Sequence, residues 1–363
     1  MSETPMYMEI VEWTKGQIFD RTVSPGDKFY SEAALCRQFC VSRQTVRRAL
    51  DILARQGYIQ RIQGSGTYIA GDTEVSTCLA LNDNLAKTVG IITVNNEYPI
   101  FPHVIEGIRE VLSGYGYALT IDTTQDDVAQ ETHALARMLD LTPAGLIVEP
   151  TKSGLPCLNT KLYRALFQRG IPVVFTNSRY ADIPGPCICL DDDAVGYNAT
   201  QYLIEMGHKN IAGVFAHTNQ SGLLRYRGYA RALLNNNLAL RDDYVHWYRH
   251  ETLEDTLRGG LLWATVSTCT AIVCYNDQIA TRLMDQLTKH GLRVPEDISI
   301  ISPDNTDAAQ RVGLTSIDHP SKMLGHAAAD VLRRMIMGGQ GDDVVFAPEL
   351  IIRNSVRRPG NFL

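Results

Sequence analysis

The sequence contains no uncharged apolar run of 18 residues, the length expected of a membrane-spanning helix. Its opening stretch, MSETPMYMEIVEW, carries three glutamates and lacks the basic and apolar regions of an export signal. These absences exclude the usual signatures of membrane and secreted proteins. We therefore expect a soluble protein that acts in the cytoplasm.

Cysteine motifs are also missing. The eight cysteines form no Cys-x-x-Cys pair, the spacing most typical of zinc and redox sites. Most of them lie in apolar surroundings such as AIVCY, which favours reduced thiols that fill core space. We expect neither a disulfide framework nor a metal site, and nothing in the sequence indicates a cofactor.

Common enzyme signatures are absent as well: there is no Gly-x-Ser-x-Gly, His-Glu-x-x-His, Walker loop or Gly-x-Gly-x-x-Gly. The run Asp191-Asp192-Asp193 has the residue types of a Mg²⁺ site. A turn at the end of a strand, with acids that cap the next helix, is the favoured interpretation. We therefore predict that the protein is not an enzyme.

The net charge of -6 is divided unevenly along the chain. Residues 1 to 70 carry nine Lys and Arg against seven Asp and Glu, whereas the remainder carries 25 against 33. Residues 37 to 61 contain six arginines and a single acidic residue, Asp51. A basic stripe on a small unit with an acidic body is typical of a nucleic-acid-binding domain, although a solvated helix face has the same composition.

The first 70 residues have the pattern of three helices and a hairpin. Apolar residues recur at helical spacing over residues 6 to 18, and Ser31 and Ser42 are good N-caps for two further helices. YIQRI and TYIA alternate on either side of a Gly-Ser-Gly turn, which predicts a hairpin over residues 58 to 70. Two short helices joined by a tight turn and followed by a hairpin are typical of a winged helix-turn-helix.

A chain of 363 residues exceeds the size of one hydrophobic core. After a connector at residues 71 to 86, nearly all-apolar strands alternate with amphipathic helices, which predicts parallel sheets covered on both faces. The α/β region 87 to 363 fits two doubly wound lobes, with crossovers near residues 190, 318 and 343. The predicted strands are residues 88–94, 118–122, 145–150, 172–177, 187–191, 210–216, 271–277 and 298–302.

The N-terminal region resembles the winged helix-turn-helix of the gluconate-repressor (GntR) family. The resemblance is carried by Ser31-Glu32, by VSRQTVRRALDILARQGYIQR from Val41 and by QGSGTYI from Gln63. It implies that the second helix of the motif reads the major groove of operator DNA and that the wing tip approaches the minor groove. The DNA-binding residues that it implies are Glu32, Ser42, Arg43, Gln44, Thr45, Arg47, Gln63 and Gly64. Many members have an arginine where this chain has Ala33. Arg48 and Arg55 are expected on a solvated or salt-bridged surface.

Residues 87 to about 357 resemble the sugar-binding domain of the lactose-repressor family, which is similar to type I periplasmic sugar-binding proteins. Among the carriers are TVGIIT, RGIPVVFTNSRY, TQYLIEMGHKNIAGVF, CYNDQIA and GLRVPEDISIIS. The pairing with a GntR winged helix resembles the arabinose-responsive repressors of Gram-positive bacteria. It implies a homodimeric repressor of sugar-utilisation genes that binds palindromic operator DNA and is released by a small sugar, L-arabinose above all. Another pentose, a hexose or a nucleoside is the alternative effector.

A neutral sugar needs polar groups that donate and accept, together with an aromatic face. Such residues follow the predicted strands, where α/β sheets bind ligands. Four of these residues also have alternatives to ligand binding. Asn276 could cap the next helix, and Phe101 could be a core residue. His319 could be structural, and Glu149 could form a salt bridge with Lys152. The effector-binding residues implied by the resemblance are Phe101, Glu149, Asn177, Arg225, Asn276, Asp304 and His319.

The remaining rival is an enzyme-derived regulator, such as the aminotransferase-like proteins that share this winged helix. Those proteins need a Schiff-base lysine. The region after residue 86 has only six lysines, none in a cofactor-anchoring setting, and is short for that fold. A sugar sensor is therefore preferred.

Overall fold

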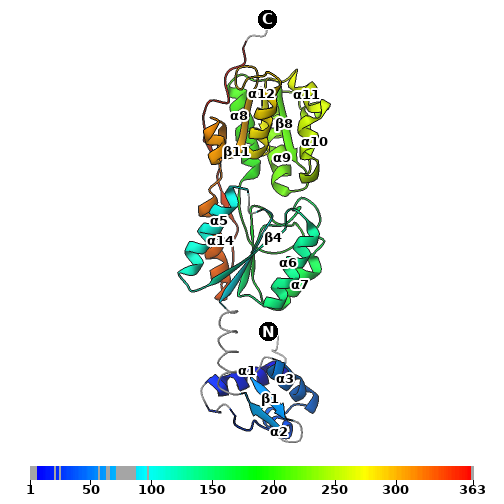
Figure 1. Cartoon of the computed structure of the whole chain (residues 1–363), viewed down its shortest axis with the longest axis vertical. Coiled ribbons are helices and arrows are strands. Elements are labelled where there is room, and N and C mark those ends of the chain that lie inside the picture. The colour runs from blue at the N-terminus through cyan, green and yellow to red at the C-terminus, as the bar shows by residue number, and fades with distance from the viewer. Residues whose placement is uncertain are drawn as a thin grey trace. The chain divides into compact units, whose positions relative to one another are not determined.

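The computed structural model describes residues 6–19, 22–23, 26–55, 58–62, 66–70, 87–95 and 98–360. The chain divides into two compact units, Met1–Ala86 and Lys87–Leu363, called here the N-terminal unit and the C-terminal unit (Figure 1). The connector expected at residues 71 to 86 lies outside the described residues.

In the residues that the structure describes, the N-terminal unit has three helices and a two-stranded antiparallel hairpin. Ser31 accepts a hydrogen bond from the amide of Ala34, and Ser42 accepts one from the amide of Thr45, so both predicted N-caps are present. Between the two helices Cys40 has a left-handed backbone, with φ of 53°, which makes the turn tight. The elements are α1 (Met6–Phe19), α2 (Glu32–Phe39), α3 (Arg43–Arg55), β1 (Ile59–Ile62) and β2 (Gly66–Ile69).

A small core holds this unit together. Val46, Leu50 and Leu53 recur at helical spacing along α3 and are fully buried, as the sequence pattern requires of its inner face. They pack with Ile10 of α1 and Leu35 of α2. The outer face of α3 is thereby left to solvent.

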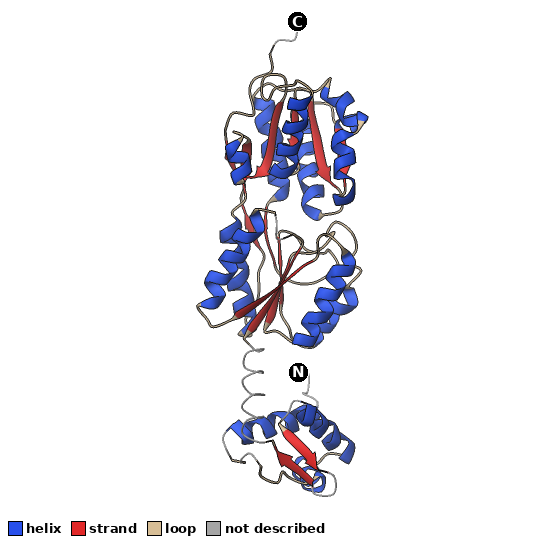
Figure 2. Ribbon diagram, viewed as in Figure 1, coloured by secondary structure: helices blue, strands red, loops and turns tan. Residues whose placement is uncertain are grey.

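The C-terminal unit contains two lobes, each built on a six-stranded sheet with helices on both faces (Figure 2). The N-lobe comprises residues 87–190 and 321–346, and the C-lobe residues 191–318 and 349–360. This arrangement confirms the predicted α/β fold of two doubly wound lobes.

The N-lobe sheet has the strand order β13-β7-β6-β5-β3-β4, with every pair parallel. Its strands are β3 (Thr88–Thr93), β4 (Ala118–Thr123), β5 (Gly145–Val148), β6 (Val173–Thr176), β7 (Cys187–Leu190) and β13 (Val344–Phe346). Its helices are α5 (Ile100–Ser113), α6 (Val128–Leu141), α7 (Thr160–Gln168) and α14 (Ser321–Ile336). Helices α5 and α14 pack on one face of the sheet, and α6 and α7 pack on the other.

The C-lobe sheet has the order β14-β12-β11-β10-β8-β9 and is parallel except for its edge strand β14. Its strands are β8 (Ile211–Ala216), β9 (Val245–Tyr248), β10 (Ala271–Cys274), β11 (Ser299–Asp304), β12 (Thr315–Asp318) and β14 (Glu349–Ile351). Its α-helices are α8 (Asp192–Glu205), α9 (Gln220–Asn235), α10 (Leu253–Arg258), α11 (Gly260–Val266), α12 (Asp277–Lys289) and α13 (Asp307–Arg311). Two 3-10 helices, η1 (Asp242–Tyr244) and η2 (His250–Thr252), flank β9.

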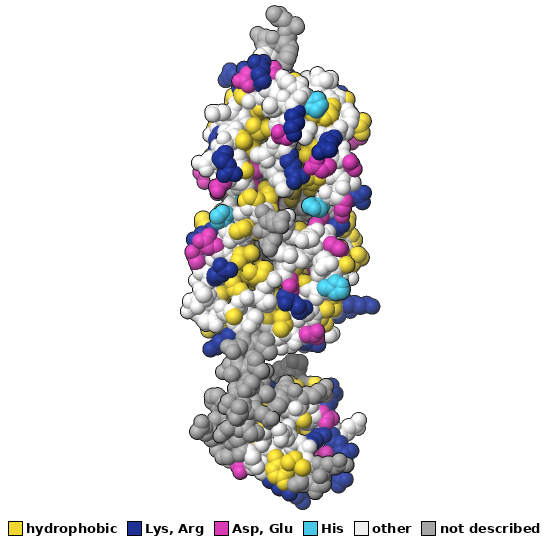
Figure 3. Space-filling model, in the orientation of Figure 1, with side chains coloured by type: hydrophobic (Ala, Val, Ile, Leu, Met, Phe, Trp, Pro, Cys, Tyr) yellow, Lys and Arg dark blue, Asp and Glu magenta, His cyan; other side chains and the backbone are white. Residues whose placement is uncertain are grey.

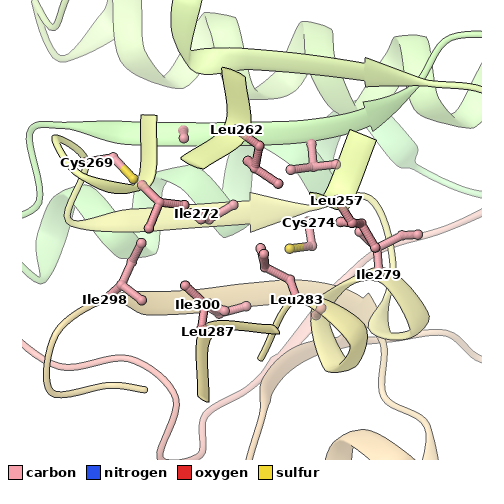
Figure 4. Close-up of a cluster of buried hydrophobic side chains, with 14 of the residues drawn as sticks. Leu257, Leu262, Cys269, Ile272, Cys274, Ile279, Leu283, Leu287, Ile298 and Ile300 are labelled. Atoms are coloured by element: carbon pink, nitrogen blue, oxygen red, sulfur yellow. The ribbon is translucent and has the colours of Figure 1, made fainter. Parts of the chain in front are cut away.

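One face of the C-lobe sheet forms the core shown in Figure 4. Leu257 of α10, Leu262 of α11 and Leu283 of α12 meet Ile272 and Ile300 on the central strands β10 and β11. Strands that are buried on both faces have nearly continuous apolar sequences. These strands were therefore predictable from the sequence.

All eight predicted strands are present. Strands β9, β12, β13 and β14 were not predicted as strands. Strands β9, β12 and β14 mix polar with apolar residues, and β13, although apolar, is only three residues long.

The chain crosses between the lobes three times: after β7, between β12 and α14, and between β13 and β14. The first two crossings lie after Leu190 and after Asp318. The third lies at residues 347–348, a few residues beyond the predicted position near 343. The reason is that Val344–Phe346 first pairs with β7 as the edge of the N-lobe sheet.

Two helices that carry site residues, α8 and α9, lie unusually close. A Cβ atom placed on Gly196 of α8 would lie 1.9 Å from the carbonyl oxygen of Arg225, and one on Gly228 of α9 would lie 2.0 Å from that of Asp193. Only glycine fits at such an approach. The backbones of α8 and α9 can therefore touch, and this brings Arg225 beside the first turn of α8.

Among the described residues, no helix is long and apolar enough to cross a membrane. The seven cysteines in the described part of the chain are free thiols, whereas Cys78 lies outside it. Within the same residues, no cluster of His, Cys, Asp and Glu has the composition of a metal site.

Candidate functional site: an interlobe pocket and a helix-turn-helix surface

A cavity of about 390 Å³ lies between the two lobes of the C-terminal unit. This volume is in the range of small-molecule sites. All seven effector-binding residues expected from the sequence line it, namely Phe101, Glu149 and Asn177 from the N-lobe, Arg225, Asn276 and Asp304 from the C-lobe, and His319 at the second crossover. The fold therefore brings together residues that lie up to 218 positions apart in sequence, counted from Phe101 to His319.

Arg225 of α9 is the centre of the C-lobe half of the pocket. Its Nε donates to Asp192 Oδ1 at 2.7 Å, and its Nη1 donates to the carbonyl oxygen of Tyr275 at 2.6 Å. Its Nη2 lies 3.9 Å from Asp304 Oδ1, and the guanidinium carbon is 4.8 Å from the centre of the Tyr275 ring. Burial disfavours the charged form of Arg225, but Asp192 and Asp304 outweigh that effect, so the pKa of Arg225 lies above its ordinary value.

Asp304 ends strand β11 with a strained backbone. Its φ is 114°, and the next residue, Asn305, has a φ of 52°. Residues other than glycine rarely adopt these angles, and such strain is found where a side chain must be aimed at a site. Asp304 is almost fully buried, and burial raises the pKa of its carboxyl, against the opposing effects of Arg225 and Tyr98.

The loop after Asp304 is held in place by a second buried acid. Asp277, the first residue of α12, accepts hydrogen bonds from Ser302, Thr306 and Ser316 at 2.6 to 3.0 Å. Burial, together with the charge of Asp304, raises the pKa of Asp277 to about 6. Because Ser302 and Thr306 flank Asp304 and Ser316 lies on the neighbouring strand β12, Asp277 serves to fix the loop to the sheet rather than to bind a ligand.

Glu149 and Asn177 form the N-lobe half of the pocket. Glu149 accepts from the Thr93 hydroxyl, the Val94 amide and Asn177 Nδ2, each at 3.0 Å. Burial raises the pKa of Glu149 to about 7. The amide oxygen of Asn177 is buried and has no partner among the described residues, so it is a ready acceptor for a ligand donor.

The salt bridge considered for Glu149 and Lys152 is not formed. Lys152 Nζ instead contacts Glu251 Oε1 of the C-lobe at 3.0 Å. Lys152 has a left-handed φ of 52°, which turns the chain after β5 toward the other lobe. Glu149 is therefore available to the pocket.

His319 is neutral and has one nitrogen to offer. Burial, and then the charge of Arg225, lower its pKa to about 4. Its Nδ1 lies 2.7 Å from Ser321 Oγ, which itself donates to the His319 carbonyl at 3.1 Å. Ser321 must then accept from Nδ1–H, which leaves Nε2 as an acceptor for a ligand hydroxyl. His319 therefore both holds the crossover through Ser321 and lines the pocket.

Asn276 and Phe101 also have two roles. Asn276 Oδ1 caps α12 by accepting from the Ile279 amide at 3.0 Å, and its Nδ2 group can donate to a ligand. Phe101 lies in the first turn of α5 and is 8% exposed, which places it both in the core and in the pocket wall. Its ring can supply the apolar face that a sugar requires.

Sequence reasoning missed three pocket residues that contact Arg225 or Asp304: Tyr98, Asp192 and Tyr275. The capping interpretation of the acidic run is right for Asp191, which accepts from the Ala194 amide, but wrong for Asp192, which pairs with Arg225. Tyr275 directly follows β10, and its position at a strand end was the available signal, whereas Tyr98 lies just before α5 and had no such signal.

The second candidate surface is the outer face of α2 and α3 in the N-terminal unit. Ser42, Arg43, Gln44 and Arg47 are exposed there, and Thr45 is half-buried with its hydroxyl 2.9 Å from that of Ser42. Gln63 and Gly64, expected at the wing tip, lie outside the described residues. Figure 3 shows Lys and Arg side chains gathered along one edge of this unit (Figure 3).

Two of the arginines are paired with acids. Arg47 Nε lies 3.1 Å from Glu32 Oε2 of α2, and Arg61 of β1 lies 2.8 Å from Asp51 of α3. Arg48 is exposed, as expected, and its guanidinium carbon lies 4.2 Å from the centre of the Tyr7 ring, a contact that the sequence did not predict. Glu32 thus fixes the direction in which Arg47 leaves α3.

Two family descriptions match this chain. Residues 6–69 match bacterial regulatory proteins of the gntR family, and residues 200–356 match a periplasmic binding protein-like domain.

Relatives and solved structures agree with these matches. The chain is 35% identical to the arabinose metabolism transcriptional repressor of Geobacillus stearothermophilus, over 97% of this chain and 98% of that protein. It is 33% identical to the protein of the same name from Halalkalibacterium halodurans, over 96% of each. Among solved structures, transcription regulator CcpA of Lactococcus lactis superposes with a TM-score of 0.67 at 25% identity, over 75% of this chain and all of that one.

Proposed function

Because this chain belongs to the family of the arabinose metabolism transcriptional repressors, we propose that its interlobe pocket binds L-arabinose and that the bound sugar releases the protein from operator DNA. The family consists of sugar-responsive, DNA-binding repressors and not of enzymes, as the sequence predicted. A DNA-binding repressor acts where the chromosome is, which in bacteria is the cytoplasm.

The observation that carries the sugar assignment is the placement of two polar clusters in one cavity. Asp192, Arg225 and Asp304 form the cluster of the C-lobe, and Glu149 and Asn177 form that of the N-lobe. Sugar hydroxyls both donate and accept, so a single sugar can satisfy both clusters at once. A ligand held from both sides favours the closed arrangement of the lobes.

The charges of the pocket support a neutral ligand. Arg225 is already compensated by Asp192 and Asp304, and the partners of Glu149 among the described residues, Thr93, Val94 and Asn177, are neutral. A sugar phosphate or sugar acid would bring its negative charge close to these carboxylates, which is unfavourable in a buried site. A neutral pentose meets no such penalty.

The exposed face of α3 supports DNA binding by insertion into the major groove. Arg43 and Gln44 lie on its first turn, which a recognition helix presents to base edges. Arg47 lies one turn further along, oriented by Glu32. In this proposal the protein acts as a homodimer whose two-fold symmetry matches a palindromic operator.

Binding of the sugar changes the free energy of DNA binding, typically by about 1–3 kcal/mol for one effector. Binding of DNA changes the free energy of sugar binding by the same amount. A sugar that binds the closed lobes more tightly shifts the population toward them. The shift weakens operator binding and allows transcription.

Isothermal calorimetry with L-arabinose tests the sugar assignment. Wild type is expected to bind and Arg225→Ala to show no measurable heat, because the pocket loses its central donor. A thermal-shift panel of L-arabinose, D-ribose, D-xylose, D-glucose and adenosine separates the alternative effectors. Equal affinity of Arg225→Ala and wild type would remove Arg225 from the site.

A gel-shift titration with duplex fragments from the gene's own neighbourhood tests the DNA assignment. Arg43→Ala is expected to lower the affinity, and L-arabinose is expected to release wild type from the duplex. Analytical ultracentrifugation reports whether the protein is a dimer at the concentrations used. Failure of wild type to bind any such fragment would refute the repressor mechanism for this chain.

A further inference from the structure

The two lobes contact each other directly at several places around the pocket, and two of these contacts bear on closure. At the first, the loop after β5 reaches the C-lobe: the Gly154 amide donates to the Thr218 carbonyl at 2.9 Å, and Ser153 Oγ accepts from the Gln220 amide at 3.0 Å. At the second, the hydroxyl of Tyr98 in the N-lobe donates to Asp304 Oδ2 in the C-lobe. Only the second contact reaches the charged cluster around Arg225.

The acceptor of this bond is held rigidly. Asn305, next to Asp304, donates from its amide to Ser316 Oγ at 2.9 Å and from Nδ2 to Asp318 Oδ1 at 2.7 Å. Together with the bonds to Asp277, these contacts hold the carboxylate of Asp304 toward the N-lobe in spite of its strained backbone. The carboxylate is therefore a fixed target for a donor that arrives when the lobes close.

The donor is placed by its surroundings as well. Tyr98 stands just before α5, and its ring packs edge-on to Phe101 with ring centres 6.4 Å apart. Burial, and the negative charge of Asp304, raise the pKa of Tyr98 well above its ordinary value, so the hydroxyl keeps its proton. A neutral hydroxyl that donates to a buried carboxylate forms one of the stronger hydrogen bonds in proteins.

We propose that Tyr98 is a positioning residue for the sugar site, whose hydroxyl binds Asp304 across the lobe boundary and stabilises the closed arrangement that the sugar requires. The proposal rests on the sugar function of the pocket and adds the residue that controls its closure. Asp304 retains other lone pairs for the sugar, because a carboxylate can accept about four hydrogen bonds. Tyr98 and the sugar therefore act together on Asp304.

The amide of Gly154 provides a reporter of closure that needs no sugar. It is bonded across the lobes to Thr218, at a different site from Tyr98. If the lobes open more often, this amide exchanges faster with deuterated solvent. Hydrogen exchange of the full-length protein, followed by NMR or by mass spectrometry with electron-transfer fragmentation, measures this rate at residue level.

Tyr98→Phe removes only the hydroxyl. We expect exchange at Gly154 to become about tenfold faster without sugar, and the affinity for L-arabinose to fall by about tenfold, as for the loss of a hydrogen bond to a charged group. Tyr115→Phe, on the exposed surface of the N-lobe, is the matched control and is expected to change neither value. In an Asp304→Asn background, Tyr98→Phe is expected to accelerate Gly154 exchange by much less than tenfold, because the charged acceptor is already gone.

Three results would overturn the proposal. Unchanged exchange at Gly154 in Tyr98→Phe would show that the hydroxyl does not hold the lobes together. Tighter binding of L-arabinose would show that the hydroxyl competes with the sugar for Asp304. An equally large acceleration in the Asp304→Asn background would show that Tyr98 acts through another partner. If wild type fails to bind L-arabinose, the sugar assignment fails, whereas the exchange measurement still tests the bond itself.

Discussion

Arg225 on α9 and Asp192 on α8 form an ion pair, with Nε and Oδ1 2.7 Å apart and only 8% and 4% of the two side chains exposed. Removing one partner of a buried pair leaves the other charge uncompensated, which typically costs about 3–5 kcal/mol. We expect Asp192→Ala to lower the free energy of unfolding of the C-terminal unit by that amount and to abolish sugar binding. Urea denaturation and calorimetry measure the two effects.

The neighbouring residue provides the control. Asp193 pairs with Arg227 and Arg231 at the surface, where ion pairs contribute only about 0–1 kcal/mol. Asp193→Ala should therefore change stability little and leave sugar binding intact. Equal destabilisation by both substitutions would mean that the acidic run acts through the first turn of α8 and not through Arg225.

Glu149 makes the stability of the protein depend on pH. Its pKa is raised from 4.5 to about 7 by burial. Between these values the unfolded chain has lost the proton and the folded protein keeps it, so the contribution of Glu149 to stability falls as the pH rises from about 4.5 to about 7. At 1.36 kcal/mol for each pH unit, the total is about 3 kcal/mol.

Glu149→Gln removes this dependence. We expect the variant to gain stability relative to wild type, by up to about 3 kcal/mol, between pH 5 and pH 7.5. Urea denaturation at the two pH values measures the difference, and exposed Glu205→Gln serves as the control. A difference that stays constant with pH would contradict the raised pKa.

Arg47 and Arg48 are adjacent but should contribute differently to DNA binding. The side chain of Arg47 is 64% exposed and pairs with Glu32, whereas the guanidinium of Arg48 stacks on the ring of Tyr7. We expect Arg47→Ala to weaken operator binding by about 1–3 kcal/mol, as for a lost base contact. Arg48→Ala should stay within about 0.5 kcal/mol of wild type in the same gel-shift titration. Equal losses would point to overall positive charge instead of a defined contact.

Gly154 lies on the loop after β5, where the N-lobe contacts the C-lobe. A Cβ atom there would lie 3.1 Å from the Thr218 carbonyl oxygen and equally near the backbone of Asn219 and the side chain of Leu223. Gly154→Ala should act as a small wedge against closure and lower the affinity for L-arabinose by about tenfold, which corresponds to about 1.4 kcal/mol. Gly260→Ala, which meets nothing within 4 Å, is the control. Unchanged affinity in Gly154→Ala would show that the lobes can absorb the extra methyl group.

Local pattern was enough to predict most of the framework. Ser31 and Ser42 were predictable caps because the bonds that they accept join residues three apart. Val46, Leu50 and Leu53 were predictable core residues because helical period puts them on one face. Short edge strands such as β14 escaped prediction, because so few residues carry too little pattern to separate a strand from a loop.

The site was predictable in its members but not in its contacts. Glu149, Asn177 and Asp304 follow strands, and the carboxyl ends of parallel strands meet at one edge of a sheet. No such rule indicates that Asp192 serves Arg225, 33 residues away, because acids in a first helical turn ordinarily serve as caps. The pairing depends on the close approach of α8 and α9 that Gly196 permits.

Tyr98 illustrates what only the tertiary structure decided. Its partner Asp304 is 206 residues away and belongs to the other lobe. The sequence by itself determined that a basic winged helix precedes a two-lobed α/β sensor, since caps, periods and strand ends are set by near neighbours. Which side chains face each other across the lobe boundary follows from the packing of two separately formed sheets, and that packing depends on contacts distant in the chain.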